Sequence, residues 1–326
     1  MSTAGPLRLG ILSTAHINEK LLAGAALSVE VDVVAVGSRE LGRARAFADR
    51  HGIPAAYGSY DELLADAAVE AIYNPLPNTL HCEWSIRALE AGKHVLCEKP
   101  LSSSLAEVEG AFDVAERTGL LLAEAFMYRH HPQIARLREL VAAGAIGELR
   151  LVRATFSYGL FDEANIRLRT DVDGGALMDV GCYCISGARV VAGEPISVSG
   201  RAFTGPTGTD WVFTGSLQFP GDVIAIFDCG TCLADRDELE VVGTRGSLFL
   251  DDPWHGIDAV IELRREGGVE RIEVGPANAY QLELEDLARA VRTGGTPLIG
   301  RADAVCQARV IEALRRSAAD GRDVEL

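Results

Sequence analysis

The first third of the chain alternates between two hydrophobic periods. Short runs of consecutive apolar residues predict buried strands, and the segments between them place apolar residues at helical spacing. The predicted strands are 7–12, 31–36, 71–74, 94–97 and 120–124; the predicted helices are 17–27, 41–51, one opened by Ser59, 79–91 and one from 104 to 119. Such alternation requires a parallel sheet covered on both faces. It predicts a doubly wound α/β domain of the Rossmann type.

The pattern changes near residue 148, where longer strands follow one another with few helices between them. Short turns such as Phe219-Pro220-Gly221-Asp222 indicate antiparallel neighbours. The predicted strands are 149–157, 197–203, 211–219, 223–229, 239–242, 259–263 and 271–274, with helices at 282–292 and 302–318. We therefore expect a Rossmann domain over 1–125. An α+β domain with a large, mostly antiparallel open sheet is expected over 126–326.

Composition narrows the classes of function. The 326 residues exceed what one core supports, and 48% are hydrophobic. A formal net charge of −16 argues against nucleic acid and anionic membranes as partners. The absence of a spanning apolar run or a signal-peptide pattern leads us to expect a cytoplasmic protein.

Seven cysteines are scattered along the chain, and we expect no disulfide framework. Cys229 and Cys232 have CxxC spacing, but no second cysteine pair stands at the spacing of zinc ligands. We therefore favour packing in the sheet over metal binding or redox chemistry for these two residues. No other cluster of His, Cys and acidic residues has the spacing of metal ligands, and we expect no metal.

The turn after the first strand is the first candidate for cofactor binding. It retains one glycine of a glycine-rich dinucleotide loop, followed by small residues ahead of a helix. A tight turn without a ligand explains these residues equally well. The candidate cofactor-binding residues of this turn are Gly10, Ser13, Thr14, Ala15, His16 and Ile17.

The end of the second strand bears on cofactor choice. Ser38 and Arg39 stand where NAD-specific folds usually carry an acid, and an arginine there accommodates a 2′-phosphate. These residues favour NADP. Glu40, the next residue, is an acid that could bind the ribose of NAD, so NAD remains the alternative cofactor. If no cofactor binds here, Arg39 is simply a solvated residue of the loop.

Two motifs carry candidate chemistry. The strand 94–97 runs into Glu98-Lys99-Pro100, and ligands of open α/β sheets bind outside the carboxyl ends of the strands. Pro100 restricts Lys99 to extended conformations. In the second motif, Asp173 to Cys184, helical spacing puts Asp179 and Tyr183 at i and i+4 on one face. Taken alone, the first motif could be a strand that ends in a solvated turn. Taken alone, the second could be a capped helix with a polar face.

Together these motifs resemble the Gfo/Idh/MocA family of oxidoreductases, and the resemblance covers essentially the whole chain. Asn74-Pro75 adds to it. Three further segments resemble the branch that contains dimeric dihydrodiol dehydrogenases and D-xylose dehydrogenases, which also share the tyrosine at Tyr183. These segments are 124–129, 165–168 and 252–255.

The resemblance implies roles for individual residues. It places Lys99 beside the nicotinamide, with Asn74, Pro75, His81 and Glu98 as further cofactor-binding residues, and in the family the Lys99-Pro100 peptide is often cis. The tentative substrate residues, for which ion pairing or core packing are alternatives, are Arg129, Asn165, Arg167 and Trp254. It also implies a homodimer or homotetramer formed through the C-terminal sheet.

The implied chemistry is hydride transfer between a substrate carbon and the nicotinamide. Tyr183 is the favoured acid/base; because a free tyrosine titrates near pH ~10, the Lys99 cation is needed to favour the phenolate. Asp179 binds an adjacent substrate hydroxyl or orients Lys99. A competing assignment makes Lys99 the proton carrier.

The resulting hypothesis is an NADP-dependent dehydrogenase for a sugar or cyclic diol. One alternative is a ketosugar reductase of the same family. Another is a non-catalytic NADP(H)-binding regulatory protein, since a Rossmann fold can bind cofactor without chemistry. The joint presence of Lys99, Asp179 and Tyr183 favours an enzyme.

Overall fold

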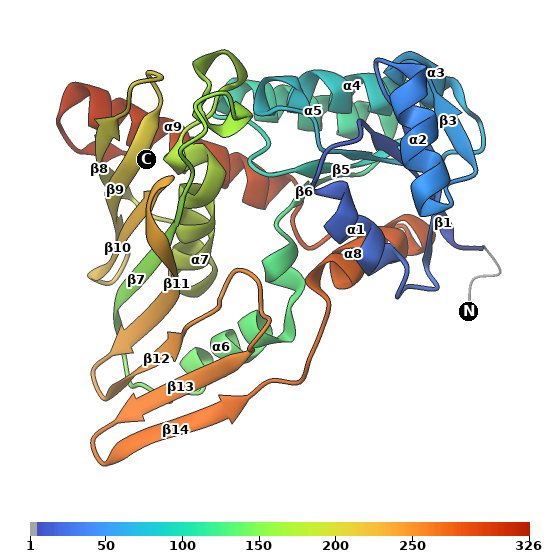
Figure 1. Ribbon diagram of the computed structural model, residues 1–326. Coiled ribbons are helices and arrows are strands. Elements are labelled where there is room, and N and C mark those ends of the chain that lie inside the picture. Colours follow the sequence, from blue (N-terminus) through green and yellow to red (C-terminus); the bar gives the residue numbers. More distant parts are fainter. Residues whose placement is uncertain (1–4) are drawn as a thin grey trace. The chain divides into compact units, whose positions relative to one another are not determined.

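The computed structural model describes residues 5–326, which divide by their contacts into two compact units (Figure 1). The first unit runs to Met127 and includes Asn278–Val305; the second comprises Tyr128–Ala277 and Cys306–Leu326. The boundary predicted between 125 and 126 lies close to the first of these divisions. The segment Asn278–Val305 differs from the prediction, which assigned it to the second domain.

The first unit is built on a parallel sheet. Among the described residues its strand order is β3-β2-β1-β4-β5-β6, the Rossmann order that the alternating pattern predicts. The strands are β1 (Leu7–Leu12), β2 (Val31–Gly37), β3 (Ala55–Tyr57), β4 (Ala71–Asn74), β5 (His94–Glu98) and β6 (Leu122–Ala125). Leu9, Ile11 and Val95 are fully buried, as expected for strands covered on both faces. The three-residue strand β3 is too short to show a period and was not predicted.

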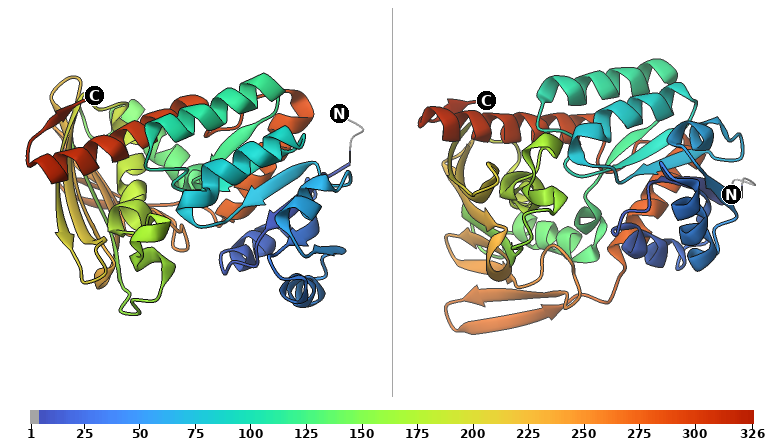
Figure 2. Two further views of the ribbon diagram at one scale, coloured as in Figure 1. Left: turned by 90° about the horizontal axis from the view of Figure 1, so that it is seen from above. Right: turned by 45° about the horizontal axis from the view of Figure 1, so that its top comes forward.

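Helices cover both faces of this sheet (Figures 1 and 2). They are α1 (Asn18–Ala25), α2 (Leu41–His51), α3 (Tyr60–Ala65), α4 (His81–Glu90), α5 (Leu105–Thr118) and α8 (Ala279–Thr293). Ser59 and Ser104 cap α3 and α5 by accepting the backbone N–H of Glu62 at 3.1 Å and of Glu107 at 3.4 Å. Both caps confirm the starts predicted from the sequence.

Helix α8 belongs to the first unit because it packs beside α1 (Figure 1). Gly24 of α1 makes this contact close, since a Cβ there would lie 2.7 Å from the backbone nitrogen of Gln281. Leu284 and Leu287 of α8 are buried in the same core as Leu9 of β1. The sequence before α8 consists mainly of predicted strands of the second sheet. It therefore gives no sign that α8 packs in the first unit.

The second unit contains a large mixed sheet. Its order among the described residues is β14-β13-β12-β11-β7-β10-β9-β8-β15, and only the β7–β10 pair is parallel. The strands are β7 (Leu149–Gly159), β8 (Ser197–Thr204), β9 (Asp210–Phe219), β10 (Val223–Gly230), β11 (Cys232–Gly243), β12 (Gly246–Leu250), β13 (Val260–Arg265), β14 (Gly268–Glu273) and β15 (Val324–Glu325). The prediction of a mostly antiparallel sheet is confirmed.

Helices pack on one face of this sheet. The regular ones are α6 (Pro132–Ala142), α7 (Cys182–Ala192) and α9 (Arg301–Asp320), which begins in the first unit. Helix α9 lies against β8 and β9, where Gly200 leaves room for the carbonyl oxygen of Leu314 (Figure 2). Helix α6 was not predicted, although Pro132 at its first turn and the His131 cap are ordinary start signals.

The apolar helical run Thr170–Ala192 is long and apolar enough to cross a membrane by length and composition alone. However, 78% of its most apolar window is buried inside the protein, as in the core helix of a soluble fold. The run therefore carries no argument for membrane insertion.

Candidate functional site

The turn between β1 and α1 has an uncommon backbone conformation at Ser13. Ser13 is in the left-handed region, with φ +71°, and donates its N–H to the carbonyl oxygen of Gly37 at 2.8 Å. The Ser13 carbonyl accepts from the side chain of the fully buried Asn18 at 3.0 Å. Non-glycine residues in this region cluster at functional turns. Asn18 is a positioning residue of the turn that the sequence did not reveal.

Gly10 contributes to close packing, and its cofactor-binding role stays a prediction. It lies within β1, and a Cβ there would stand 3.0–3.2 Å from side-chain atoms of Val69, Leu63 and Ile72. The glycine is therefore required for close packing of α3 and β4 on β1. Thr14, Ala15, His16 and Ile17 follow in the turn, and α1 begins at Asn18.

The carboxyl end of β2 carries net positive charge. Ser38 is buried, and its hydroxyl accepts the N–H of Glu40 at 3.4 Å, whereas Arg39 is exposed. The Glu40 carboxylate is paired with Arg43 at 3.0 Å. Because Arg43 compensates the acid, the cationic Arg39 fits a 2′-phosphate better than the Glu40 carboxylate fits a ribose hydroxyl.

The ends of β4 and β5 are tied together by a phenol and a carboxylate. The buried Tyr73 hydroxyl donates to Glu98 Oε1 at 2.5 Å, and Glu98 Oε2 accepts the backbone N–H of Lys99 at 3.2 Å. The pKa of Tyr73 lies well above 10, because of burial and then of the Glu98 charge, so the phenol remains a donor. The Lys99-Pro100 peptide is cis.

Asn74 and His81 are buried in a network around this end of the sheet. The Asn74 amide donates to the carbonyl oxygen of His81 at 3.0 Å and to Ser85 Oγ at 3.2 Å. The His81 ring nitrogens lie 2.9 Å from the carbonyl oxygen of Pro100 and 2.6 Å from that of Leu76. Burial lowers the pKa of His81 to about 4, so the neutral ring donates through one nitrogen. These side chains fix the shape of the segments beside Pro75 and Pro100, and a cofactor-binding role for them stays a prediction.

In the second unit, Asp179 is held by two side chains. Its Oδ2 accepts from the Tyr158 hydroxyl, and its Oδ1 accepts from Arg167 Nε at 3.2 Å. Burial, reinforced by Asp179, raises the pKa of Tyr158, so this phenol also remains a donor. Tyr158 is the last residue but one of β7 and belongs to none of the motifs, so sequence reasoning missed it.

The helix around Asp179 differs from the continuous α-helix assumed in the sequence analysis. Leu177–Gly181 forms a π-helix that leads into α7. Asp210 of β9 anchors its start by accepting the N–H of Leu177 at 2.7 Å. Isolated π turns inside helices occur often at functional sites.

Tyr183, in the first turn of α7, is surrounded by aromatic rings. Ring centroids of Tyr128, Phe156 and Trp254 lie 5.7, 5.4 and 6.0 Å from its own. Trp254 is fully buried and donates its Nε1–H to the carbonyl oxygen of Thr155 at 3.0 Å. The tryptophan therefore supports Tyr183 from the core, and the alternative of core packing describes it better than a pocket wall does.

The other tentative substrate residues have local partners. Asn165 caps a short 3-10 helix by accepting the N–H of Arg167 at 3.1 Å. Arg129 Nη1 lies 3.4 Å from Ser186 Oγ. Arg167 reaches the site through its ion pair with Asp179.

A cluster that the sequence spacing did not show lies beside this aromatic group. Asp237, Asp252 and His255 bring potential metal-ligating atoms within 4.8 Å of one another. His255 Nδ1 is 2.6 Å from Asp237 Oδ2, and its pKa is raised to about 9 by the hydrogen bonds to Asp237 and then Asp252. The imidazole and the two carboxylates therefore form an ion-pair network.

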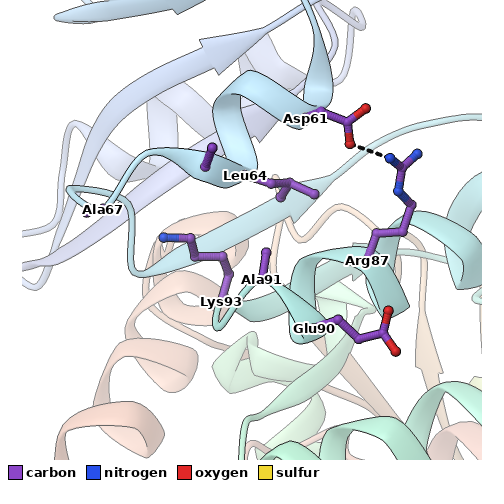
Figure 3. A pocket seen from close by; sticks show the side chains of 8 residues that line it. Asp61, Leu64, Ala67, Arg87, Glu90, Ala91 and Lys93 are labelled. Atoms are coloured by element: carbon purple, nitrogen blue, oxygen red, sulfur yellow. Dashed lines mark hydrogen bonds and ion pairs between the residues drawn. The ribbon is translucent and has the colours of Figure 1, made fainter.

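A surface hollow of about 550 Å³ in the first unit holds none of the predicted residues. It is lined by Asp61, Arg87 and Lys93 among others, with Arg87 paired to Asp61 (Figure 3). Lys93 precedes β5, so the hollow lies at the amino ends of the strands. In a doubly wound sheet this is the edge opposite the ligand site.

Comparison with known families covers both units. The description "Oxidoreductase family, NAD-binding Rossmann fold" matches residues 8–126, and "GFO/IDH/MocA C-terminal domain" matches residues 134–249.

Individual relatives support the same family assignment. The chain is 40% identical to D-xylose 1-dehydrogenase (NADP(+)) 2 of Haloferax volcanii, over 98% of this chain and 100% of that protein. It is 38% identical to human trans-1,2-dihydrobenzene-1,2-diol dehydrogenase over 78% of each. The crystal structure of KijD10, a 3-ketoreductase from Actinomadura kijaniata in complex with NADP and TDP-benzene, superposes with a TM-score of 0.91 at 32% identity, covering 96% of this chain and 98% of that one. With both family regions and full-length relatives in agreement, the chain belongs to the Gfo/Idh/MocA family of oxidoreductases, whose first domain is an NAD-binding Rossmann fold.

Proposed function

We propose that this oxidoreductase uses NADP and transfers a hydride between the nicotinamide and a hydroxyl-bearing carbon of a carbohydrate or cyclic diol. The observation that carries the proposal is the Asp179 carboxylate, fixed by Tyr158 and Arg167 in the helical segment that also bears Tyr183. An oriented carboxylate in the same helical segment as a phenol suits a substrate with adjacent hydroxyl groups. The names of the xylose and dihydrodiol dehydrogenase relatives support the same substrate class.

The preference for NADP is supported by the charges at the end of β2. Arg39 supplies an exposed guanidinium, and the competing acid Glu40 is engaged by Arg43. The left-handed turn at Ser13 and the amino end of α1 suit the pyrophosphate. The xylose dehydrogenase relative and KijD10 are both associated with NADP by name.

Three side chains are proposed to carry the chemistry. When bound, NADP⁺ accepts the hydride released by the substrate carbon. Tyr183 receives the proton of the reacting hydroxyl, and the Lys99 ammonium favours the phenolate that does so. Asp179 accepts a hydrogen bond from the adjacent hydroxyl. Substitution of Lys99, of Asp179 or of Tyr183 must therefore impair turnover.

A second candidate is reduction of a ketosugar, the reverse reaction. The similarity to the 3-ketoreductase KijD10 favours it. In that direction Tyr183 returns the proton to the carbonyl oxygen. A non-catalytic NADP(H)-binding regulatory protein predicts tight cofactor binding without turnover in either direction.

We also propose that the protein is a cytoplasmic homo-oligomer that does not bind nucleic acid or membranes. The net charge of −16 supports the exclusion of anionic partners. Ile224 and Ile226 of β10 are 42% and 43% exposed on the sheet face opposite the helices. A second copy covering this face would form the dimer, or half of a tetramer.

The experiment is a spectrophotometric panel. The purified protein is incubated with NADP⁺ or NAD⁺ and D-xylose, D-glucose, myo-inositol or a trans-dihydrodiol, and reduced nicotinamide is followed by absorbance. Turnover with NADP⁺ and one substrate class supports the proposal, and Tyr183→Phe should abolish it. Absence of turnover with every substrate, both in oxidation with NADP⁺ and in reduction with NADPH, would contradict the proposal if the cofactor is bound.

A further inference from the structure

A buried glutamine on α9 lies outside the chemistry described above. Gln307 is only 1% exposed, and it belongs to the second unit together with α7. Its Oε1 accepts from Arg189 Nη1 at 2.8 Å, and its Nε2 donates to the carbonyl oxygen of Cys182 at 2.8 Å. A buried amide that is satisfied at both ends fixes the groups on either side of it. Both of these groups belong to α7, the helix that bears Tyr183.

The direction of this amide is set by Arg189. A guanidinium can only donate hydrogen bonds, so the oxygen of Gln307 faces it and the nitrogen faces Cys182. The Arg189 side chain is 2% exposed, and its Nε and Nη2 each donate at 2.8 Å to the carboxylate of Glu194. Such a bidentate pair fixes the orientation of the guanidinium. A continuous chain of hydrogen bonds therefore runs from Glu194 through Arg189 and Gln307 to the first residue of α7.

Cys182 stands where the π-helix passes into α7. Its N–H donates to the carbonyl oxygen of Leu177, five residues back, and its thiol donates to the carbonyl oxygen of Asp179 at 3.6 Å. Its own carbonyl, which accepts from Gln307, belongs to the peptide that leads to Tyr183. Three atoms of Cys182 thus hold the junction between the π-helix and α7, and Gln307 holds one of them from another helix.

This junction determines how Asp179 and Tyr183 are placed relative to each other. A π turn closes its hydrogen bond five residues back instead of four. If it relaxed to a regular α turn, the residues after it would rotate by about 100° around the helix axis relative to those before it. Asp179 lies within the π-helix, where Tyr158 and Arg167 hold its carboxylate. Tyr183 lies beyond the junction, so its phenol follows any change there.

We propose that Gln307 is a positioning residue of the oxidoreductase reaction, which holds the π-to-α junction and so sets the placement of Tyr183 relative to Asp179. It acts through the carbonyl of Cys182, while Arg189 and Glu194 keep its amide in the donating orientation. The inference rests on the roles proposed above for the phenol and the carboxylate. A displacement of about 1 Å at a reacting group costs about a hundredfold in rate, so a loosened junction should cost about tenfold in kcat.

Two substitutions separate positioning from a structural role. Gln307→Met keeps the length of the side chain and removes both hydrogen bonds. Gln307→Glu keeps an acceptor for Arg189 but has no hydrogen to donate to Cys182, because the guanidinium keeps the introduced carboxyl ionised. If Gln307 served only to satisfy Arg189, Gln307→Glu would have the kcat of the wild type. We expect instead that kcat falls about tenfold in both variants while the KM for NADP⁺ stays within about twofold.

The matched control is Ser317→Ala, on the same helix. Ser317 is fully buried and accepts the N–H of Gly200 at 2.9 Å, so its removal loosens α9 against β8. This variant should lower the Tm and leave kcat within about twofold of the wild type. Hydrogen exchange followed by mass spectrometry adds a measurement without substrate. The amides of residues 177–187 should exchange about tenfold faster in both Gln307 variants, and at the wild-type rate in Ser317→Ala.

Three results would overturn the inference: wild-type kcat in Gln307→Glu, unchanged exchange of residues 177–187 in both Gln307 variants, or an equal loss of kcat in Ser317→Ala. The proposed function fails in a different way. If Tyr183→Phe retained full turnover, the chemistry proposed above would be wrong. Loss of turnover in Tyr183→Phe, with wild-type kcat in both Gln307 variants, would reject only the role of Gln307.

Discussion

Removing the Tyr158 hydroxyl tests the site most sharply, because this residue was found only in the structure. Tyr158→Phe keeps the ring at the end of β7 and deletes the hydrogen bond to Asp179 Oδ2. The Asp179 side chain is only 16% exposed, so water replaces the lost donor poorly. A hydrogen bond to a charged group contributes about 1.5–3 kcal/mol. If that energy orients Asp179 in the transition state, kcat/KM should fall roughly ten- to a hundredfold.

Arg167, the second partner of Asp179, should contribute less to kcat/KM than Tyr158 does. The Arg167 side chain is 50% exposed, and solvent screening limits such a pair to about 0.2–1 kcal/mol. Arg167→Ala should therefore lower kcat/KM by no more than about fivefold. The order of the two effects follows from exposure and not from formal charge.

Steady-state kinetics and thermal unfolding measure the two effects side by side. The matched control is Tyr57→Phe, which deletes a hydroxyl that donates to the Asp66 carboxylate at 2.9 Å in the first unit. Both Tyr→Phe variants should lower the Tm, but only Tyr158→Phe should lower kcat/KM. Turnover of Tyr158→Phe within about twofold of wild type would refute the role given to Asp179.

Three further outcomes are expected. Arg39→Ala should raise the KM for NADP⁺ about tenfold and leave that for NAD⁺ nearly unchanged; equal changes for both cofactors would exclude a 2′-phosphate contact. Because the folded pKa of His255 is raised to about 9 from the usual 6.5, its ion pair with Asp237 stabilises the fold fully below pH ~6.5 and loses that effect as pH rises through 9. Denaturant unfolding should show this slope in the wild type and a smaller one in His255→Gln; equal slopes would contradict the ion pair. Ile226→Glu should yield monomers by light scattering while Leu27→Glu, exposed in the first unit, does not; unchanged mass in both would locate the interface elsewhere.

Much of the first unit was predictable because its signals are local. The apolar runs at 7–12 and 71–74 coincide with β1 and β4, and Ser59 and Ser104 mark the helix starts. The sheet of the second unit was predicted less completely, since β12 continues from β11 through a tight turn and its five residues show no separate period.

The rest depended on tertiary contacts. That α8 returns to the first unit is decided by packing against α1, which periodicity cannot show. Tyr158 reaches Asp179 because β7 ends beside the π-helix, and His255, in the loop between β12 and β13, meets Asp237 of β11. Motifs identified Lys99, Asp179 and Tyr183, but the groups that orient the motif residues come from elements distant in sequence.

The central claim is that Lys99 supports hydride transfer between NADP and a polyol-like substrate. The most direct measurement is NADP⁺ reduction by wild type and Lys99→Ala, with cofactor affinity measured for both by fluorescence titration. The account predicts turnover in the wild type and a loss of at least about a hundredfold in kcat for Lys99→Ala, with NADP⁺ still bound. Equal turnover in the two proteins would contradict it.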